Sequence, residues 1–167
     1  MFRKLDDFLR AYAYQTESTK KILACLTDEN LGQAVLDGHR TLGRIAWHIT
    51  TSTAEMLNRT GLGVSAVGGD DPLPVAAEEI RTQYERVTTE AVEKIRASWS
   101  DETLAETDDM YGDQWPRGMT LAILIHHEIH HRGQMTVLLR QAGAKVPGVF
   151  GPSLEEWADY GADAPAV

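Results

Sequence analysis

The sequence predicts an all-α protein, and in particular a four-helix bundle. Four segments of about 20 residues each carry apolar side chains at helical spacing. No segment shows the sustained alternation of apolar and polar residues that is typical of a half-buried strand. At 167 residues with 43% hydrophobic side chains, the chain has the size of one ordinary domain. We therefore expect a single domain over residues 1–167, in which four amphipathic helices bury their apolar stripes against one another.

The first two helices are bounded by clear sequence signals. Residues 3–26 carry the first apolar stripe, and the turn-forming sequence TDENLG ends it. Thr41 is well placed to cap the second helix, which continues through LGRIAWHITTSTAEMLNRT until Gly61 and Gly63 break it. Cys25, late in the first helix, is expected to be a small buried hydrophobic residue rather than a nucleophile.

The last two helices follow a connector rich in glycine and proline, residues 61–74. Pro74 fits the first position of the third helix, which should run to about Trp99 with Glu78 and Glu79 in its opening turns. Residues 100–118 are polar and rich in turn formers, and we expect no strand in them. Thr120 is expected to cap the last helix, from Leu121 to Gln141, and the tail from about residue 160 to 167 to fray.

Charge and cysteine content exclude several classes of protein. The net charge of -9 argues against binding to nucleic acid or to an anionic membrane, since both require clustered Lys and Arg. The single cysteine, Cys25, allows neither an intrachain disulfide nor a cysteine zinc site. The amino-terminal segment has no unbroken apolar stretch, so neither a signal peptide nor a membrane span is predicted. These features favour a cytoplasmic protein that acts on a small molecule.

The segment His126–His131 contains four of the six histidines of the chain. At about 100° per residue, His127 and His131 lie within about 40° of each other on the core-facing stripe of the last helix. His126 and His130 form a second pair on a flank of that helix. Two imidazoles one turn apart can chelate a divalent ion without straining the helix. Two buried imidazoles without partners would instead carry a desolvation penalty of several kcal/mol. The pattern therefore predicts a metal site rather than a structural histidine cluster.

A third ligand must come from another helix. His48 lies at the edge of the apolar stripe of the second helix, next to Ser52 and Glu55, from where it could reach the last helix. His39 precedes the cap of that helix and is expected to be a solvated loop residue. We therefore expect the metal ligands to be His48, His127 and His131.

The same letters fit the zinc-protease motif, in which Glu128 of His127-Glu128-Ile129-His130-His131 would be the general base. One protease branch requires a further histidine, and the sequence has none after His131. The other requires a downstream glutamate, for which Glu155 and Glu156 are formal candidates, together with an edge strand that the sequence does not predict. The protease interpretation is therefore rejected, and Glu128 is expected to be exposed on the helix.

Two motifs resemble a known family. TLGRIAWHI at residues 41–49 and TLAILIHHEIHHRGQM at residues 120–135 resemble the DinB/YfiT-like superfamily of metal-dependent enzymes, and its DinB branch in particular. The closing VPGVFGPSLEEW is also similar. The resemblance implies an up-down-down-up four-helix bundle, often a homodimer, that binds zinc or nickel through His48, His127 and His131. It also implies relatives that are S-transferases dependent on bacillithiol or mycothiol, and a mycothiol-dependent maleylpyruvate isomerase.

These observations favour a metal-dependent enzyme that transfers a small thiol to an electrophilic small molecule. Two alternatives remain at this point. The first is a metal-dependent hydrolase, for which Glu55 is a weak candidate base. The second is a non-catalytic, stress-related dimer that binds a metal.

Three residues around the last helix carry further expectations. Gln134 could hydrogen-bond a ligand imidazole or a substrate, or make a packing contact. Arg132 is expected to pair with carboxylates of the acidic surface rather than with a substrate. Gly133 is expected to permit close approach of another helix.

Overall fold

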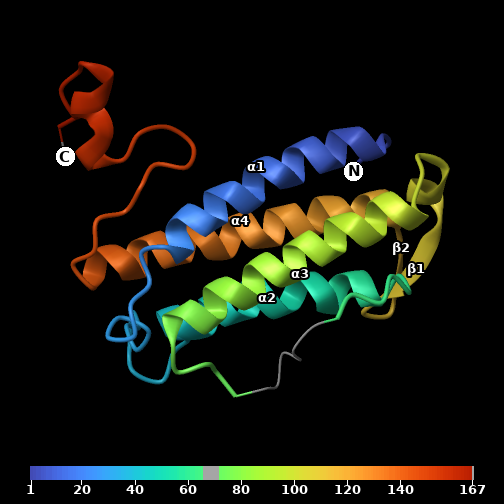
Figure 1. Ribbon diagram of the computed structural model, residues 1–167, viewed down its shortest axis with the longest axis horizontal. Coiled ribbons are helices and arrows are strands. Elements are labelled where there is room, and N and C mark those ends of the chain that lie inside the picture. Colours follow the sequence, from blue (N-terminus) through green and yellow to red (C-terminus); the bar gives the residue numbers. More distant parts are fainter. Residues whose placement is uncertain (66–71, 167) are drawn as a thin grey trace.

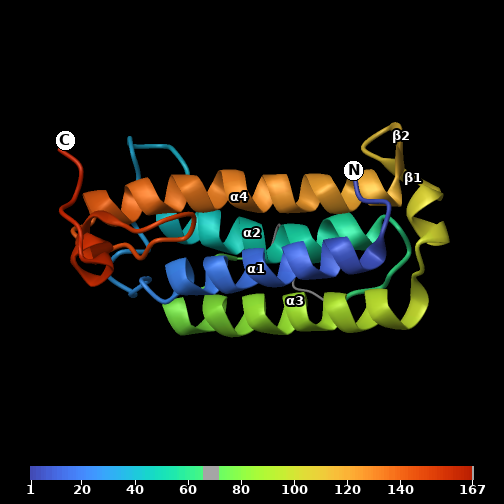
Figure 2. The ribbon, with the colours of Figure 1, turned by 90° about the horizontal axis from the view of Figure 1, so that it is seen from above.

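The computed structural model describes residues 1–65 and 72–166, and four long helices make up most of it. They are α1 (Leu5–Leu23), α2 (Leu42–Asn58), α3 (Ala77–Ser98) and α4 (Arg117–Gln141), and they lie side by side (Figures 1 and 2). Figure 1 shows α1 and α4 running in one direction and α2 and α3 in the other. This is the up-down-down-up arrangement, so the prediction of an all-α four-helix bundle is confirmed. α1 and α2 each pack against both α3 and α4.

The core consists of two apolar clusters that follow one another along the bundle. One contains Phe8, Tyr12, Leu57, Ile95 and Leu121, and the other contains Ile22, Leu42, Ile49, Ile80 and Leu139. Buried polar residues separate the clusters along three of the helices: Gln15 to Thr19 in α1, Thr50 to Thr53 in α2, and Glu128 to Arg132 in α4. The middle of the bundle is therefore its most polar layer, and the histidines belong to it.

The helix boundaries confirm some of the expected signals and correct others. The Thr41 hydroxyl accepts a hydrogen bond from Arg44 N at 3.2 Å, so Thr41 caps α2 as predicted. Pro74 does not begin α3, which starts at Ala77, where the Asp28 carboxylate accepts from the Ala77 N–H at 2.7 Å. A side chain from the α1–α2 segment thus stabilises the start of α3, which no local pattern could indicate. Cys25 lies beyond the end of α1 and is only partly buried.

The start of α4 was also misplaced. The helix begins at Arg117, whose N–H donates to the Glu106 carbonyl at 2.8 Å. Thr120 is fully buried inside the helix and caps nothing. The carbonyl of Glu106, directly before β1, therefore satisfies an N–H of the first turn of α4, whereas the sequence predicted a capping side chain, Thr120, for this purpose.

A small β-hairpin joins α3 to α4, contrary to the expectation of no strand. After a short 3₁₀ helix, η1 (Glu102–Ala105), β1 (Thr107–Met110) pairs antiparallel with β2 (Asp113–Pro116). The two-residue turn places Tyr111 and Gly112 at φ values of 63° and 93°, the geometry that tight hairpins require. Strands of four residues are too short to show a periodic pattern, so the hairpin is determined by its turn and its packing against the bundle.

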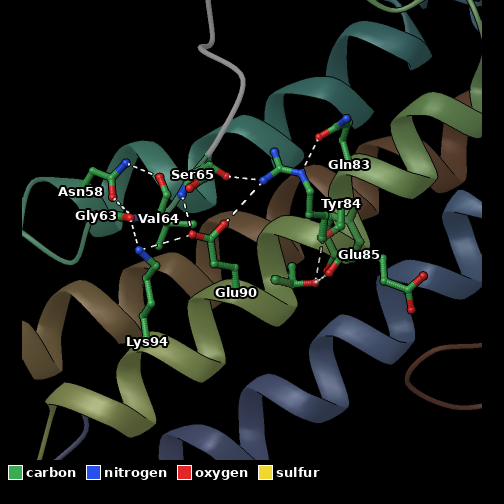
Figure 3. A network of polar contacts seen from close by, with 11 residues as sticks. Asn58, Gly63, Val64, Ser65, Gln83, Tyr84, Glu85, Glu90 and Lys94 are labelled. Atoms are coloured by element: carbon green, nitrogen blue, oxygen red, sulfur yellow. Dashed lines mark hydrogen bonds and ion pairs between the residues drawn. The ribbon is translucent and has the colours of Figure 1, made fainter.

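Polar contacts hold the chain that leaves α2 against α3 (Figure 3). The Asn58 side chain accepts from Val64 N at 2.6 Å and donates to Val64 O at 2.9 Å. The Glu90 carboxylate accepts from Ser65 N at 2.9 Å, and Lys94 donates to the Gly63 carbonyl. The first part of the long connector is therefore anchored on α3, while its residues 66–71 lie outside the described residues.

The carboxyl-terminal segment folds over one end of α1 and α4 and finishes in η2 (Leu154–Tyr160) (Figure 1). Arg140 of α4 pairs with Glu155, and the Tyr14 hydroxyl of α1 donates to Val149 O at 2.5 Å. Fraying of the last residues stays a prediction, and Val167 lies outside the described residues. Among those residues, no helix combines the length and the apolar character needed to cross a membrane.

Two glycines of α4 have opposite surroundings, and this corrects the expectation for Gly133. A Cβ at Gly118 would lie 2.1 Å from the Phe2 carbonyl oxygen, whereas a Cβ at Gly133 would meet nothing within 4 Å. We predict that Gly118→Ala lowers the free energy of unfolding by about 2 kcal/mol or more because backbone must move. Gly133→Ala should raise it by up to about 1 kcal/mol through helix propensity.

Urea unfolding of the two variants checks this prediction. Since they make the same chemical change in the same helix, each is the control of the other. Equal effects of the two substitutions would contradict the packing described for Gly118.

Candidate metal centre

Three imidazole rings from two helices meet at the polar layer of the bundle. The Nε2 atoms of His48 in α2 and His127 in α4 are 3.2 Å apart, and Nε2 of His131 is 3.2 Å from that of His127. The potential ligand atoms of these residues all lie within 4.8 Å of one another. The antiparallel contact between α2 and α4 produces this convergence, because it brings the middle of one helix against the middle of the other. These are the three residues that the sequence predicts as ligands: His127 and His131 from their helical spacing, and His48 as the third ligand from another helix.

The other histidines stay outside the cluster. His39 is exposed in the α1–α2 segment, as expected, with its Nδ1 3.3 Å from the Asp37 carbonyl oxygen. His126 is exposed on α4. His130 is exposed too, and its ring centroid lies 4.9 Å from that of His131. The flank pair of α4 therefore surrounds the cluster without joining it.

Hydrogen bonds on the far side of two rings orient their lone pairs toward the centre. Nδ1 of His131 lies 2.7 Å from Oε1 of Gln134, which can only accept, so Nδ1 carries the proton. The Ser52 hydroxyl donates to the His48 carbonyl at 2.6 Å, which leaves its oxygen to accept from His48 Nδ1 at 3.4 Å. Both rings then present an unprotonated Nε2 to the cluster. Of the alternatives that the sequence left open for Gln134, the structure shows the hydrogen bond to an imidazole of the cluster.

Protonation of the cluster is disfavoured near neutral pH. Burial, with a further contribution from the neighbouring imidazoles, lowers the pKa of His48 and of His127 to about 4. Burial also lowers the pKa of His131, against the opposing effect of its hydrogen bond to Gln134. His48 and His131 therefore present lone pairs to the cluster while neutral, an arrangement that a cation between the rings would stabilise.

The separation of the nitrogens fits a metal ion. Ligand nitrogens about 2.05 Å from a tetrahedral zinc ion lie about 3.3 Å from one another. The two Nε2 distances of 3.2 Å agree with that edge length, and the ligand atoms of the whole set lie within 4.8 Å of one another. The chemistry of the donors agrees as well, because neutral imidazole is a ligand for zinc, nickel and related ions. The cluster could therefore hold one divalent ion.

The nearest carboxylate on α2 is already engaged. Glu55 accepts from Arg59 Nε at 2.6 Å and from the Tyr111 hydroxyl at 2.7 Å, one bond to each of its oxygens. The Arg59 guanidinium also lies over the Tyr111 ring, 4.2 Å from its centroid. These contacts tie the tip of the hairpin to α2. They also reduce the availability of Glu55 as a general base.

Glu128 is buried rather than exposed, so that expectation was wrong. Only 1% of the residue is exposed, and its Oε1 accepts from the Thr19 hydroxyl at 2.5 Å and from the Tyr84 hydroxyl at 2.6 Å. Burial raises the pKa of Glu128, and these hydrogen bonds oppose the shift. The carboxylate points toward α1 and α3, whereas the imidazoles face α2. This orientation removes the remaining basis for the protease interpretation.

Arg132 is likewise buried, contrary to expectation, and it forms no ion pair with a surface carboxylate among the described residues. Its guanidinium donates to the Gln15 carbonyl at 3.1 Å, to Gln15 Oε1 at 2.7 Å and to the Thr19 hydroxyl at 3.1 Å. Thr19 thus links Arg132 to Glu128. Two features of the sequence are consistent with this network: Glu128 and Arg132 lie one helical turn apart in α4, and the apolar stripe of α1 contains polar residues such as Thr19.

Comparison with known proteins identifies relatives over the whole chain. A family model described as "DinB family" matches residues 1–165. A protein of Bacillus subtilis strain 168, named "Uncharacterized protein YrdA", is 43% identical over 167 residues, which is 100% of each chain. The crystal structure of a DinB-like protein from Bacillus cereus ATCC 10987 superposes with a TM-score of 0.87 at 45% identity, covering 90% of this chain and 100% of that one. A DinB-like protein of Bacillus subtilis, YjoA, shares the fold, with a TM-score of 0.68 at 15% identity over 86% of this chain and 97% of that one.

The low pKa values predict how the stability of the metal-free protein depends on pH. His48 and His127 take up protons near the ordinary value of 6.5 in the unfolded chain but only near 4 in the fold. Between these values the unfolded state binds more protons, so stability falls as the pH is lowered through this window and is unaffected above it. Urea unfolding of chelator-treated protein at pH 7.5, 6.5, 5.5 and 4.5 measures the loss.

The double variant His48→Asn, His127→Asn should show a shallower loss over the same interval. The variant His39→Asn, which changes an exposed histidine, should keep the original slope. A wild-type stability that does not change from pH 6.5 to 4.5 would contradict the burial of neutral imidazoles.

Burial of Glu128 predicts two effects of substitution. Glu128→Gln retains an oxygen for Thr19 and Tyr84 and should cost less than about 2 kcal/mol of stability, whereas Glu128→Ala leaves polar partners unsatisfied and should cost about 3 kcal/mol or more. Metal content should be unchanged in both variants, as elemental analysis can measure. Complete loss of metal in the Gln variant would make this carboxylate a ligand and contradict its assigned position.

Proposed function

The chain belongs to the DinB family, and we propose that it binds one divalent metal ion through His48, His127 and His131 and transfers a small thiol to electrophilic molecules. The observation that supports the metal site is the convergence of three imidazole nitrogens from α2 and α4. The transfer reaction rests on the resemblance to thiol-dependent members of the family. Zinc and nickel are the metals we propose, and bacillithiol or mycothiol represents the class of thiol.

A divalent ion held by three neutral imidazoles leaves a coordination position for a ligand, where it would lower the pKa of a thiol and so supply a thiolate at neutral pH. The protein residues prepare this chemistry in two ways. Gln134 and Ser52 fix the ring orientation of His131 and His48, so that their lone pairs point inward. Because His48 and His127 are only about half-buried, a small molecule can reach the cluster from solvent.

We favour transfer over hydrolysis because of the state of Glu55. A hydrolase needs a carboxylate or imidazole free to take a proton from water. Both oxygens of Glu55 are engaged by Arg59 and Tyr111. A thiolate that is formed at the ion needs no such base. We further propose, from the resemblance alone, that the protein is cytoplasmic and works as a homodimer. Analytical ultracentrifugation of the purified chain tests the dimer.

Metal analysis of protein purified without a histidine tag tests the site. We expect about one zinc or nickel per chain, and we expect its loss in His48→Ala and in His131→Ala, since two imidazoles alone hold a divalent ion weakly. His126→Ala is the matched control on α4 and should keep the metal. Gln134→Ala should weaken metal binding by about 10-fold or more, because His131 loses the partner that orients it. Full metal retention in the His48 variant would contradict the ligand set.

Thiol transfer is tested with the metal-loaded protein, monochlorobimane and a panel of low-molecular-weight thiols. We expect one class of thiol to give turnover that disappears in His131→Ala and persists in His126→Ala. A wild-type protein that contains the metal yet responds to no thiol would refute the transferase assignment while leaving the metal site in place.

A further inference from the structure

A positively charged side chain lies beside the histidine cluster without belonging to it. Arg40 is exposed at the end of the segment that joins α1 to α2, directly before the cap residue Thr41. Arg40 and Gln134 line one pocket, and Gln134 Oε1 lies 2.7 Å from Nδ1 of His131, so the guanidinium lies on the Gln134 side of the cluster.

Arg40 has no acidic partner within 4.0 Å in residues 1–65 and 72–166. This contrasts with the arginines that are paired with Asp or Glu in the same part of the chain, which are Arg10, Arg59, Arg81, Arg86, Arg117 and Arg140. The chain has 25 acidic residues for 16 basic ones, so an exposed arginine without a carboxylate partner among the described residues is available to an anion from solution.

Arg40 lines a pocket next to the cluster. Its volume is about 230 Å³, and its lining consists of one cation, one amide and three apolar side chains: Arg40, Gln134, Val35, Val137 and Leu138. Gln134 forms the boundary with the cluster, since its Oε1 is 2.7 Å from His131 Nδ1. Val35 and Val137 are 63% and 55% exposed, which is unusual for valines and leaves an apolar wall open to a ligand. None of the lining residues is acidic.

We propose that this Arg40 pocket binds the carboxylate of a small amphipathic molecule, whose short apolar segment lies against Val35, Val137 and Leu138 and whose far end reaches the histidine cluster. The planar guanidinium matches the two oxygens of a carboxylate. The role of the far end rests on the proposed function, whereas the binding of the carboxylate does not. The carboxylate could belong to the thiol or to its electrophilic acceptor.

Binding of hexanoate and of hexanamide to the full-length protein tests the pocket directly. The two probes share their apolar segment and differ in charge. We expect the wild-type protein to bind hexanoate at least about fivefold more tightly than hexanamide, with NMR shifts at Arg40, Val35 and Val137. Arg40→Gln should abolish this preference, and Arg40→Lys should retain part of it. Arg96→Gln removes the same charge from an exposed site near the end of α3 and should leave the preference intact.

The titration is carried out on protein as purified and again after chelator treatment. A preference that disappears with the metal would mean that the carboxylate binds the ion, and it would overturn the role of Arg40. Equal binding of the two probes, or an equal effect of Arg40→Gln and Arg96→Gln, would overturn it as well. The two proposals can fail separately. If the protein binds no metal or transfers no thiol, the proposed function is refuted. If such a protein still prefers hexanoate to hexanamide, the Arg40 pocket is supported.

Kinetics with matched reagents then identify which reactant carries the carboxylate. One arm compares 6-mercaptohexanoate with 6-mercaptohexanol against monochlorobimane, and the other compares iodoacetate with iodoacetamide against a neutral thiol. Arg40→Gln should raise KM about fivefold or more for the charged reagent in one arm, with little change in kcat. An unchanged KM for both charged reagents would contradict the proposal.

Discussion

The convergence of three imidazole rings, with Nε2 of His127 3.2 Å from Nε2 of both His48 and His131, is the constraint on which the rest of the site depends. Such a cluster is unfavourable by itself, because burial removes the rings from water and lowers their affinity for protons. It persists in the fold because α2 and α4 are held together by apolar packing on both sides of the polar layer. The bundle thus positions groups that would otherwise move apart, as expected for a site built to receive a cation.

α4 has two roles through two pairs of residues rotated by about 100°. His127 and His131 face α2 and form the cluster with His48. Glu128 and Arg132 face α1 and α3, where Thr19 connects them. This buried network constrains the rotation of α4 about its own axis, since a turned helix would separate a carboxylate and a guanidinium from all their partners. This network of Thr19, Glu128 and Arg132 therefore helps to align α4 at the metal centre from the opposite face of the helix.

The sequence predicted those features that depend on local periodicity. The four helices, the cap at Thr41 and the shared face of His127 and His131 follow from spacing along one segment, and the approach of His48 follows from helix packing. The misplaced features all depend on distant contacts. Asp28 sets the start of α3, Glu106 contributes to that of α4, and the hairpin is too short to show a period. The burial of Glu128 could not be predicted either, because its partners Thr19 and Tyr84 are polar residues on other helices. The position of Arg40 beside the cluster likewise depends on how an irregular segment folds back.

X-ray absorption spectroscopy of the purified, tag-free protein at the edge of its bound metal tests the central claim most directly. Three imidazole nitrogens at about 2.0–2.1 Å, with at least one further light-atom ligand, are expected for zinc. A spectrum from His48→Ala should show only two imidazoles, and residual metal should be correspondingly low. A first shell that contains fewer than three imidazoles in the wild-type protein, or one dominated by carboxylate oxygens, would contradict the assignment of this cluster as the metal centre.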